Sequence, residues 1–361
     1  MTEGFRPFRV VRKIRESTII TSFYLEPLDE QEVTACKPGQ YITVRVPGTA
    51  GKTVLKTYSV SSNVTNKSGY RITVKKEGAP VHAPDAPPGI GSCYLHDQVD
   101  VGSILEVAAP RGEFYLNEAS DRPVLLLSGG VGLTPLVSMF HSLIETQRPV
   151  FFLHACENGD IHALRDEILN LSEGNESRVK VHFVYRAPTP ADIETAKHHS
   201  VGYITKELLQ SLLPLDDYEV YFCGPTPFMK AMYNLTRSLG ISDARISYEF
   251  FGSATSLVEA ASVKPAPDQP PQQSQDGGIE VVFAKSGVTG FWHNNTGSLL
   301  EFAEDLGLAP EFSCRSGICS TCMCPLLEGE VTYIEDPLED AEEGNVLICC
   351  SQPRGRIGLD I

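Results

Sequence analysis

Residues 124–140 read VLLLSGGVGLTPLVSMF. The apolar run at 124–127 predicts a fully buried strand, and the glycines behind it predict a tight turn. These glycines are Gly129, Gly130 and Gly132. A glycine turn between a strand and a helix brings backbone N–H groups against a pyrophosphate, although glycines that pack a helix against a sheet look similar. The stretch therefore predicts an α/β domain with a candidate nucleotide site.

A helix is expected directly after this turn. Leu136, Phe140 and Ile144 recur at helical spacing and share one apolar face. We expect Thr134 to cap the helix and Pro135 to stand at its first position, where a missing N–H costs nothing.

Further apolar runs at 151–153, 181–185 and 220–223 alternate with helical patterns, and a last strand is expected at 246–251. This alternation is typical of a parallel, doubly wound α/β sheet. The chain before residue 119 differs, because its short runs alternate apolar and polar residues with period two. These runs are FRVVRKI, TIITSFYLEP, YITVRVP, TYSVSS, YRITVKKE and ILEVAAP. They predict a small antiparallel β-barrel.

The segment 264–278, KPAPDQPPQQSQDGG, has four prolines and four glutamines and no aromatic or branched apolar residue. Such a composition predicts a linker. A strand at 279–284 and a helix at 299–306 follow it, in a small α+β, β-grasp-like domain. We expect a multidomain chain, with a barrel domain at 1–118, a nucleotide-binding domain at 119–252, the linker at 253–278 and a last domain at 279–361.

Composition supports this division, since 361 residues suit two to three domains and 42% apolar residues can fill separate cores. The formal charge of −16 provides no electrostatic footprint for nucleic acid. The longest uncharged stretch, 123–140, is broken by glycine and proline and is not expected to span a membrane. No signal peptide is visible, so a reducing cytoplasm is the expected location.

Six of the ten cysteines fall between residues 314 and 350. Cys314, Cys319 and Cys322 have the C-x4-C-x2-C spacing of plant-type [2Fe–2S] domains. A structural zinc site is the alternative, but zinc sites generally pair two short ligand units. The fourth ligand is Cys349 or Cys350, because only one of two adjacent residues points inward from a strand.

A second motif, YFCGPTPFM, places Cys223, Gly224 and Pro225 at the C-terminal end of another strand, where α/β sheets bind ligands. GGVGLTP followed by CGPTPFM resembles the ferredoxin–NADP reductase superfamily. The resemblance implies that the first motif holds the phosphates of a nicotinamide dinucleotide and that Cys223 lies beside the nicotinamide. A buried, inert Cys223 is the alternative.

The same resemblance extends to a flavin motif. Lys56, Thr57, Tyr58 and Ser59 match R-x-Y-S/T, with lysine in place of arginine. The match implies that Tyr58 packs on the flavin ring and that Ser59 bonds near its N5 edge. Lysine lacks the planar bidentate grip of arginine on phosphate, so a lower FAD affinity is expected.

Other segments resemble the family at positions that contact FAD. YRITVKKEG, with Val74 and Lys75, and IGSCYLHD, with Gly91 and Ser92, correspond to the strand and loop that hold the flavin phosphates. Tyr41 in PGQYITV matches a flavin-contacting tyrosine, but a place in the core fits it equally well. SYEFFGS resembles the terminal E-x-F-G segment, which implies that Glu249 and Phe251 lie near the flavin. The catalytic candidates are Ser59, Cys223 and Glu249.

Residues 1–252 most resemble the reductase part of flavohaemoproteins, and the cysteine-rich segment resembles the ferredoxin domains of reductases. In those domains a final C-x-S-x-P-like pattern follows the fourth ligand, which favours Cys349. The implied path runs from NAD(P)H through FAD and the [2Fe–2S] cluster to an external acceptor such as an oxygenase or hydroxylase. FAD is needed because a nicotinamide supplies electrons in pairs and a cluster accepts them singly.

NADH is expected over NADPH, because HACENGD offers no basic residue for a 2′-phosphate, although Arg165 and Arg186 could reach one. The run 328–344 holds eight acidic residues and no basic one. It is either a solvated face or a surface that attracts a basic acceptor. Two other functions stay open: direct reduction of a small acceptor such as a quinone, ferric iron or oxygen, and redox sensing with negligible turnover.

Overall fold

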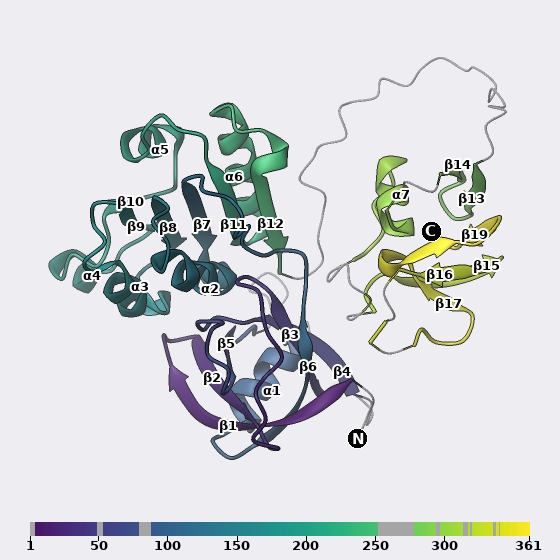
Figure 1. The fold of residues 1–361 in the computed structure, drawn as a ribbon, viewed down its shortest axis with the longest axis horizontal. Coiled ribbons are helices and arrows are strands. Elements are labelled where there is room, and N and C mark those ends of the chain that lie inside the picture. The colour runs from purple at the N-terminus through teal and green to yellow at the C-terminus, as the bar shows by residue number, and fades with distance from the viewer. Residues whose placement is uncertain are drawn as a thin grey trace. The chain divides into compact units, whose positions relative to one another are not determined.

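The computed structural model describes residues 4–48, 53–78, 88–251, 278–293, 297–312, 317, 320–334, 337–338 and 340–361. The chain divides into two compact units, Met1–Phe251 and Gly252–Ile361. The first unit contains a barrel and a parallel sheet, and the second contains the cysteine-rich domain (Figure 1).

The barrel is built from six antiparallel strands in the order β4-β3-β6-β1-β2-β5 (Figure 1). Their bounds are β1 (Phe5–Arg15), β2 (Ile20–Pro27), β3 (Tyr41–Pro47), β4 (Thr53–Ser59), β5 (Tyr70–Lys75) and β6 (Ile104–Arg111). A single bridge between Val60 and Ile72 joins the two edges of the sheet. Alternate apolar side chains, such as Phe23 and Ile42, are fully buried inside, as the period-two pattern predicts.

Residues 90–97 were expected as a loop, and this expectation is wrong. They form helix α1 (Ile90–Gln98). Leu95 is fully buried in the barrel core, and this contact supplies the packing that a short helix needs in order to form.

The second part of the first unit is a sheet of six parallel strands in the order β10-β9-β8-β7-β11-β12 (Figure 1). The bounds are β7 (Val124–Gly129), β8 (Val150–Cys156), β9 (Val179–Tyr185), β10 (Ser200–Val201), β11 (Glu219–Gly224) and β12 (Ile246–Phe250). The strand order reverses between β7 and β11. In open α/β sheets, the crevice for a ligand lies at such a reversal, beyond the C-terminal ends of the strands.

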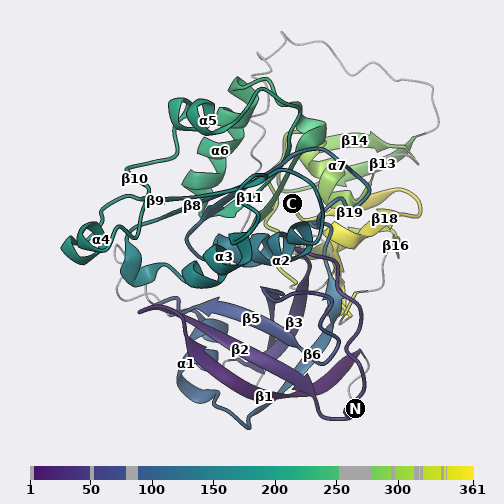
Figure 2. The same ribbon diagram turned by 60° about the vertical axis from the view of Figure 1, so that its left-hand side comes forward.

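Helices cover both faces of this sheet, with α2 and α3 on one side and α5 and α6 on the other (Figures 1 and 2). The bounds are α2 (Leu133–Ile144), α3 (Arg165–Ser172), α4 (Pro190–Glu194), α5 (Lys206–Leu212) and α6 (Thr226–Ser238). Within the described ranges, no helix is both long and apolar enough to cross a membrane.

The predicted start of α2 is also wrong. A 3₁₀ turn at Gly130–Gly132 leads into the helix, which begins at Leu133 with Gly132 at the N-cap. Thr134 therefore lies inside the first turn, where its hydroxyl donates to the carbonyl of Val131 at 3.2 Å. Pro135 still fits there, because the first turn has no intrahelical acceptor for its missing N–H.

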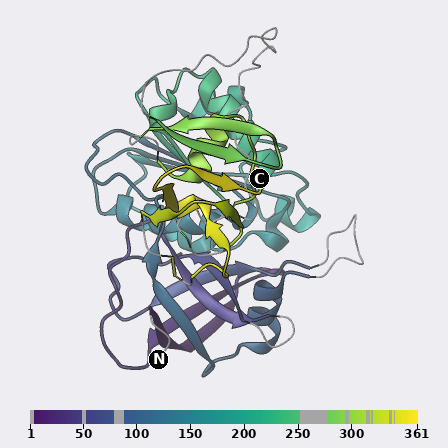
Figure 3. The same cartoon turned by 90° about the vertical axis from the view of Figure 1, so that its right-hand side faces the viewer.

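The described residues of the second unit form a five-stranded sheet, β14-β13-β19-β15-β17, a pair β16-β18 and one α-helix (Figure 3). The bounds are β13 (Ile279–Phe283), β14 (Val288–Trp292), α7 (Leu299–Asp305), β15 (Met323–Glu328), β16 (Val331–Tyr333), β17 (Asn345–Leu347), β18 (Ser351–Pro353) and β19 (Ile357–Leu359). Ser298 and Glu301 form a capping box at the start of α7. The predicted α+β class is confirmed.

Candidate functional site

Three predicted residues from distant parts of the chain meet in the first unit. Cys223 and Glu249 are direct neighbours in the ladder between β11 and β12. Ser59 ends strand β4 of the barrel, and its hydroxyl lies close enough to the Glu249 carboxyl to lower the pKa of that group. The barrel and the parallel sheet therefore share one polar site.

Burial dominates the electrostatics of this site. Burial raises the pKa of Glu249 to about 8, although the nearby Ser59 hydroxyl lowers this pKa in part. Burial also raises the pKa of the Cys223 thiol. At neutral pH the site therefore holds an uncharged carboxyl and an uncharged thiol. Ser59 Oγ and Glu249 Oε2 are buried without a regular hydrogen bond among the described residues. Such unsatisfied buried atoms suit a polar ligand edge.

The flavin motif on β4 packs against the start of α1. A Cβ on Gly91 would lie 2.6 Å from the Lys56 side chain and 2.8 Å from the Tyr58 hydroxyl, so only glycine fits there. Ser92 accepts a hydrogen bond from the backbone N–H of Glu77 at 3.1 Å. Lys56 is exposed and Tyr58 is half-buried. The predicted contacts with FAD thus come from adjoining segments, at a helix N-terminus that favours phosphate.

The other flavin-site predictions differ in their surroundings. The Tyr41 ring is 5% exposed and packs against Gly112. Val74 is buried in β5, and Lys75 pairs with Glu77 at 2.8 Å. The remaining predicted positions are Thr57, half-buried in β4, and Phe251, which is 43% exposed.

The glycine turn lies against the end of β11. A Cβ on Gly132 would lie 2.3 Å from the carbonyl oxygen of Cys223, so this glycine allows the close approach of two backbones. Gly130 has a φ of +55°, and among the described residues nothing lies within 4 Å of the position of a Cβ. The turn therefore has one packed side and one open side, as a pyrophosphate cradle requires.

Phe228 was not predicted from the sequence, although it lies in the same motif as Cys223. A Cβ on Gly129 or Gly224 would lie 2.8 or 2.7 Å from the Phe228 ring, so this ring covers both glycines. Pro225 is exposed at the N-cap of α6, which carries Phe228. The position of an aromatic residue directly after CGPTP could have indicated a ring that packs on the glycine turn.

An ion pair between the barrel and the sheet domain was also missed. Arg71 of β5 donates two hydrogen bonds to Glu167 of α3, at 2.6 and 2.8 Å. Burial alone would raise the pKa of Glu167, but hydrogen bonds from His141 and Arg71 lower it to about 2. This pair joins the two domains that supply the shared site, and single-sequence patterns cannot reveal such a long-range contact.

In the second unit, Cys322 and Cys349 are buried at 4% and 6% exposure. Gly317, in the cysteine loop, donates its backbone N–H to the sulfur of Cys349 at 3.3 Å. An amide that points at a sulfur is the environment of a cluster thiolate. Cys314 and Cys319 lie outside the described residues.

The expectation that Cys349 and Cys350 lie on a strand is wrong, because they belong to a 3₁₀ turn, Ile348–Cys350. Such a turn buries both side chains, so strand alternation cannot distinguish them. Their partners differ: Cys349 accepts the Gly317 N–H, whereas the Cys350 thiol donates to the carbonyl of Leu347 at 3.5 Å. A Cβ on Gly317 would lie 2.7 Å from the Cys350 sulfur, so both sulfurs lie near the cysteine loop, and Cys349 stays a prediction as the fourth ligand.

Three family models match separate parts of the chain. They are an oxidoreductase FAD-binding domain at residues 7–115, an oxidoreductase NAD-binding domain at 126–234 and a 2Fe-2S iron-sulfur cluster binding domain at 291–354. The flavohem-like FAD/NAD-binding domain of nitric oxide dioxygenase from Vibrio cholerae is 34% identical, with a TM-score of 0.61. That match covers 100% of the Vibrio chain and 69% of this one. The chain belongs to the ferredoxin–NADP reductase superfamily.

Other members of the superfamily match different shares of the chain. A flavohemoprotein of Bacillus thuringiensis is 44% identical over 259 residues, which are 71% of this chain and 63% of that protein. The chain thus spans less than two thirds of the curated relatives that it matches. Phthalate dioxygenase reductase is 23% identical with a TM-score of 0.57, and the match covers 99% of this chain and 98% of that one. This last match shows a common fold over all three domains.

Proposed function

We propose that the chain is an NADH-dependent reductase that passes electrons through FAD and a [2Fe–2S] centre to an external redox protein. The observation that carries the proposal is the meeting of Ser59 with Cys223 and Glu249 where the barrel adjoins the nucleotide-binding domain. A cluster-binding domain on the same chain supplies the one-electron exit.

The chain's own residues would prepare this site in distinct ways. The turn at Gly130–Gly132 would offer backbone N–H groups to a dinucleotide phosphate. Cys223 would lie beside the nicotinamide with an uncharged thiol. The Ser59 hydroxyl and the protonated Glu249 carboxyl would donate hydrogen bonds to the reacting edge of the flavin. FAD, when bound, converts the paired electrons of a hydride into single electrons.

The preference for NADH is supported by the contacts of the two arginines that could bind a 2′-phosphate. Arg186 donates to both oxygens of Glu157 at 2.6 Å. Arg165 donates to the carbonyl of Lys197 and to Asp166. Both guanidinium groups therefore already have acceptors, and the Glu157 carboxylate would repel an added phosphate.

An oxygenase or hydroxylase component is the acceptor that we propose. The acidic run 328–344 offers exposed carboxylates at Asp340, Glu342 and Glu343, on the domain that would hold the cluster. A basic surface on the acceptor would be attracted to them at low ionic strength.

The experiment is an anaerobic stopped-flow reduction of the full chain by NADH. Flavin and cluster absorbance are both expected to fall, and the chain should then reduce cytochrome c rapidly. A Cys322→Ser variant serves as the control, because it should reduce its flavin and lose most cytochrome c reduction. A cluster that stays oxidised while the flavin is reduced would contradict the proposed path. Unchanged transfer by Cys322→Ser would instead favour direct reduction of acceptors by the flavin.

A further inference from the structure

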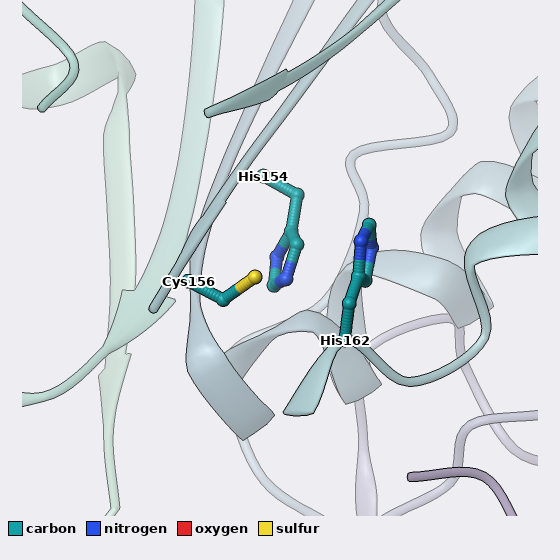
Figure 4. Close-up of side chains that lie close together, drawn as sticks. All are labelled: His154, Cys156 and His162. Atoms are coloured by element: carbon teal, nitrogen blue, oxygen red, sulfur yellow. The ribbon is translucent and has the colours of Figure 1, made fainter. Parts of the chain in front are cut away.

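His154, Cys156 and His162 form a cluster in the nucleotide-binding domain that the proposed electron path does not use (Figure 4). His154 and Cys156 belong to β8, and His162 follows the 3₁₀ turn Gly159–Ile161. One donor atom from each side chain lies within 4.8 Å of those of the other two. The imidazole centroids are 4.4 Å apart.

Both imidazoles have one satisfied and one unsatisfied nitrogen. Nδ1 of His154 lies 2.8 Å from the Ser128 hydroxyl, and Nδ1 of His162 lies 2.8 Å from the Tyr185 hydroxyl. Nε2 of each ring is buried and has no hydrogen-bond partner in the part of the chain that the structure describes. His154 is 0% exposed and His162 is 5% exposed, so bulk water does not compensate for these missing bonds.

We propose that His154, Cys156 and His162 bind a divalent cation of the zinc class. Two imidazole nitrogens and a thiolate are the donor types that zinc prefers. Histidine ligands are usually oriented by a hydrogen bond on the other ring nitrogen, and Ser128 and Tyr185 would supply these bonds.

The geometry needs only a small contraction to accept the ion. Tetrahedral zinc holds nitrogen and sulfur ligands about 3.4 to 3.6 Å apart, so donor atoms within 4.8 Å of one another must approach by about 1 Å. Cys156 is half-buried, and rotation of its short side chain can supply part of this movement. The Asn158 carbonyl oxygen, 3.4 Å from the Cys156 sulfur, or a water would complete the coordination.

The surrounding charges also favour a cation. The carboxylate of Asp192 accepts the backbone N–H of Gly159 at 3.0 Å, in the 3₁₀ turn that leads to His162. Metal binding would release the thiol proton to solvent, leaving two neutral imidazoles, one thiolate and the ion with a net charge of +1. Asp192 is 2% exposed and lies against this turn, so its carboxylate would partly offset the charge.

The test measures zinc binding by the full chain with its FAD and cluster loaded, using zinc chloride as the only probe. The variants Cys156→Ala and His162→Gln remove one ligand each. Cys36→Ala is the matched control, because Cys36 is also half-buried but belongs to no such cluster among the described residues. The wild type and Cys36→Ala should bind one more zinc per chain than Cys156→Ala, and both ligand variants should lose at least tenfold in affinity.

Equal zinc binding by all four proteins would overturn the proposal, and so would wild-type affinity in Cys156→Ala. A second measurement needs no variant and therefore does not depend on mutant folding. Zinc should slow alkylation of Cys156 by iodoacetamide at least fivefold, as followed by peptide mass spectrometry, and should leave Cys36 unaffected. Equal rates at Cys156 with and without zinc would also overturn the proposal.

Discussion

Cys223 and Glu249 lie side by side on the parallel strands β11 and β12, and the Ser59 hydroxyl of the barrel faces the same carboxyl. Two residues of the nucleotide-binding domain thus share a buried site with one residue of the other domain. The site is complete only when the two domains are packed together, so interdomain contacts should affect both stability and turnover.

The protonation of Glu249 predicts a pH-dependent stability. Its pKa is raised from 4.5 to about 8 by burial, so the folded chain binds more protons than the unfolded chain between these values. The free energy of unfolding should therefore fall as pH rises from about 4.5 to 8, by on the order of 1 kcal/mol per pH unit. Thermal unfolding at several pH values should show this slope in the wild type and a flatter profile in Glu249→Gln. Identical profiles would contradict a raised pKa at Glu249.

Removal of Arg71 should weaken the packing of the two domains. Arg71→Leu removes the ion pair with Glu167 and leaves this carboxylate without its arginine, which should lower the free energy of unfolding by about 3 kcal/mol. Because the pKa of Glu167 is held at about 2, the wild-type advantage should be present above pH 4.5 and should be lost as pH falls towards 2. Denaturant titration at pH 7 and pH 3 checks this. The control is Lys67→Leu, which breaks an exposed ion pair with Glu32 and should cost less than about 1 kcal/mol. A similar cost for both variants would argue against an interdomain role for Arg71.

Gly132→Ala should damage the nucleotide site. The added methyl group would lie 2.3 Å from the carbonyl oxygen of Cys223, so the turn or β11 must shift. We expect a loss of about 2 kcal/mol in stability and a rise of at least tenfold in the KM for NADH. Gly355→Ala is the control, since no described atom lies within 4 Å of its Cβ position. Wild-type kinetics for Gly132→Ala would show that the turn does not approach the nucleotide.

Glu157→Gln should relax the preference for NADH. The substitution removes the charge that binds Arg186 through two hydrogen bonds, leaving the guanidinium able to bind a 2′-phosphate. The ratio of kcat/KM for NADPH to that for NADH should rise about fivefold, roughly 1 kcal/mol. Glu173→Gln is the control and should leave the ratio unchanged, because Glu173 is exposed at the C-terminal end of α3. An unaltered ratio in Glu157→Gln would place the discriminating contacts elsewhere.

Adjacent cysteines should differ in their importance for the cluster. Cys349→Ser should lose most of the iron and the visible absorbance of the centre, because its sulfur accepts the Gly317 N–H. Cys350→Ser should retain both, since its thiol donates to the Leu347 carbonyl and a serine hydroxyl can do the same. Iron analysis of the two purified variants distinguishes them, and the reverse result would make Cys350 the ligand.

Several structural features were predictable because they depend on local physics. The apolar run before Gly129 forms a strand that is buried on both faces of its sheet. The run YITVRVP also forms a strand, although packing buries residues 41–44 on both faces and not on one alone. The motifs GGVG and CGPTP also have local causes, since each joins a strand to a helix N-terminus. The cysteine spacing similarly indicates a cluster without any knowledge of distant contacts.

Predictions failed where packing changed a local preference. Thr134 is a good cap by composition, but the 3₁₀ turn before it starts the helix earlier. Residues 90–97 form a helix because Leu95 packs into the barrel core. Cys349 and Cys350 lie in a 3₁₀ turn and not on a strand. These outcomes depend on which surfaces are available to be covered, and that information is not local.

The sequence by itself determined the classes of the domains and the kinds of group that they bind, because strand period, turn glycines and cysteine spacing act over a few residues. Only the tertiary structure decided that Ser59 meets Glu249, that Arg71 reaches Glu167, and that His154 and His162 leave two nitrogens unsatisfied beside a thiol. Each of these relations joins different segments of the chain through strand order and side-chain packing. Their energies depend on burial, which exists only once the domains have formed.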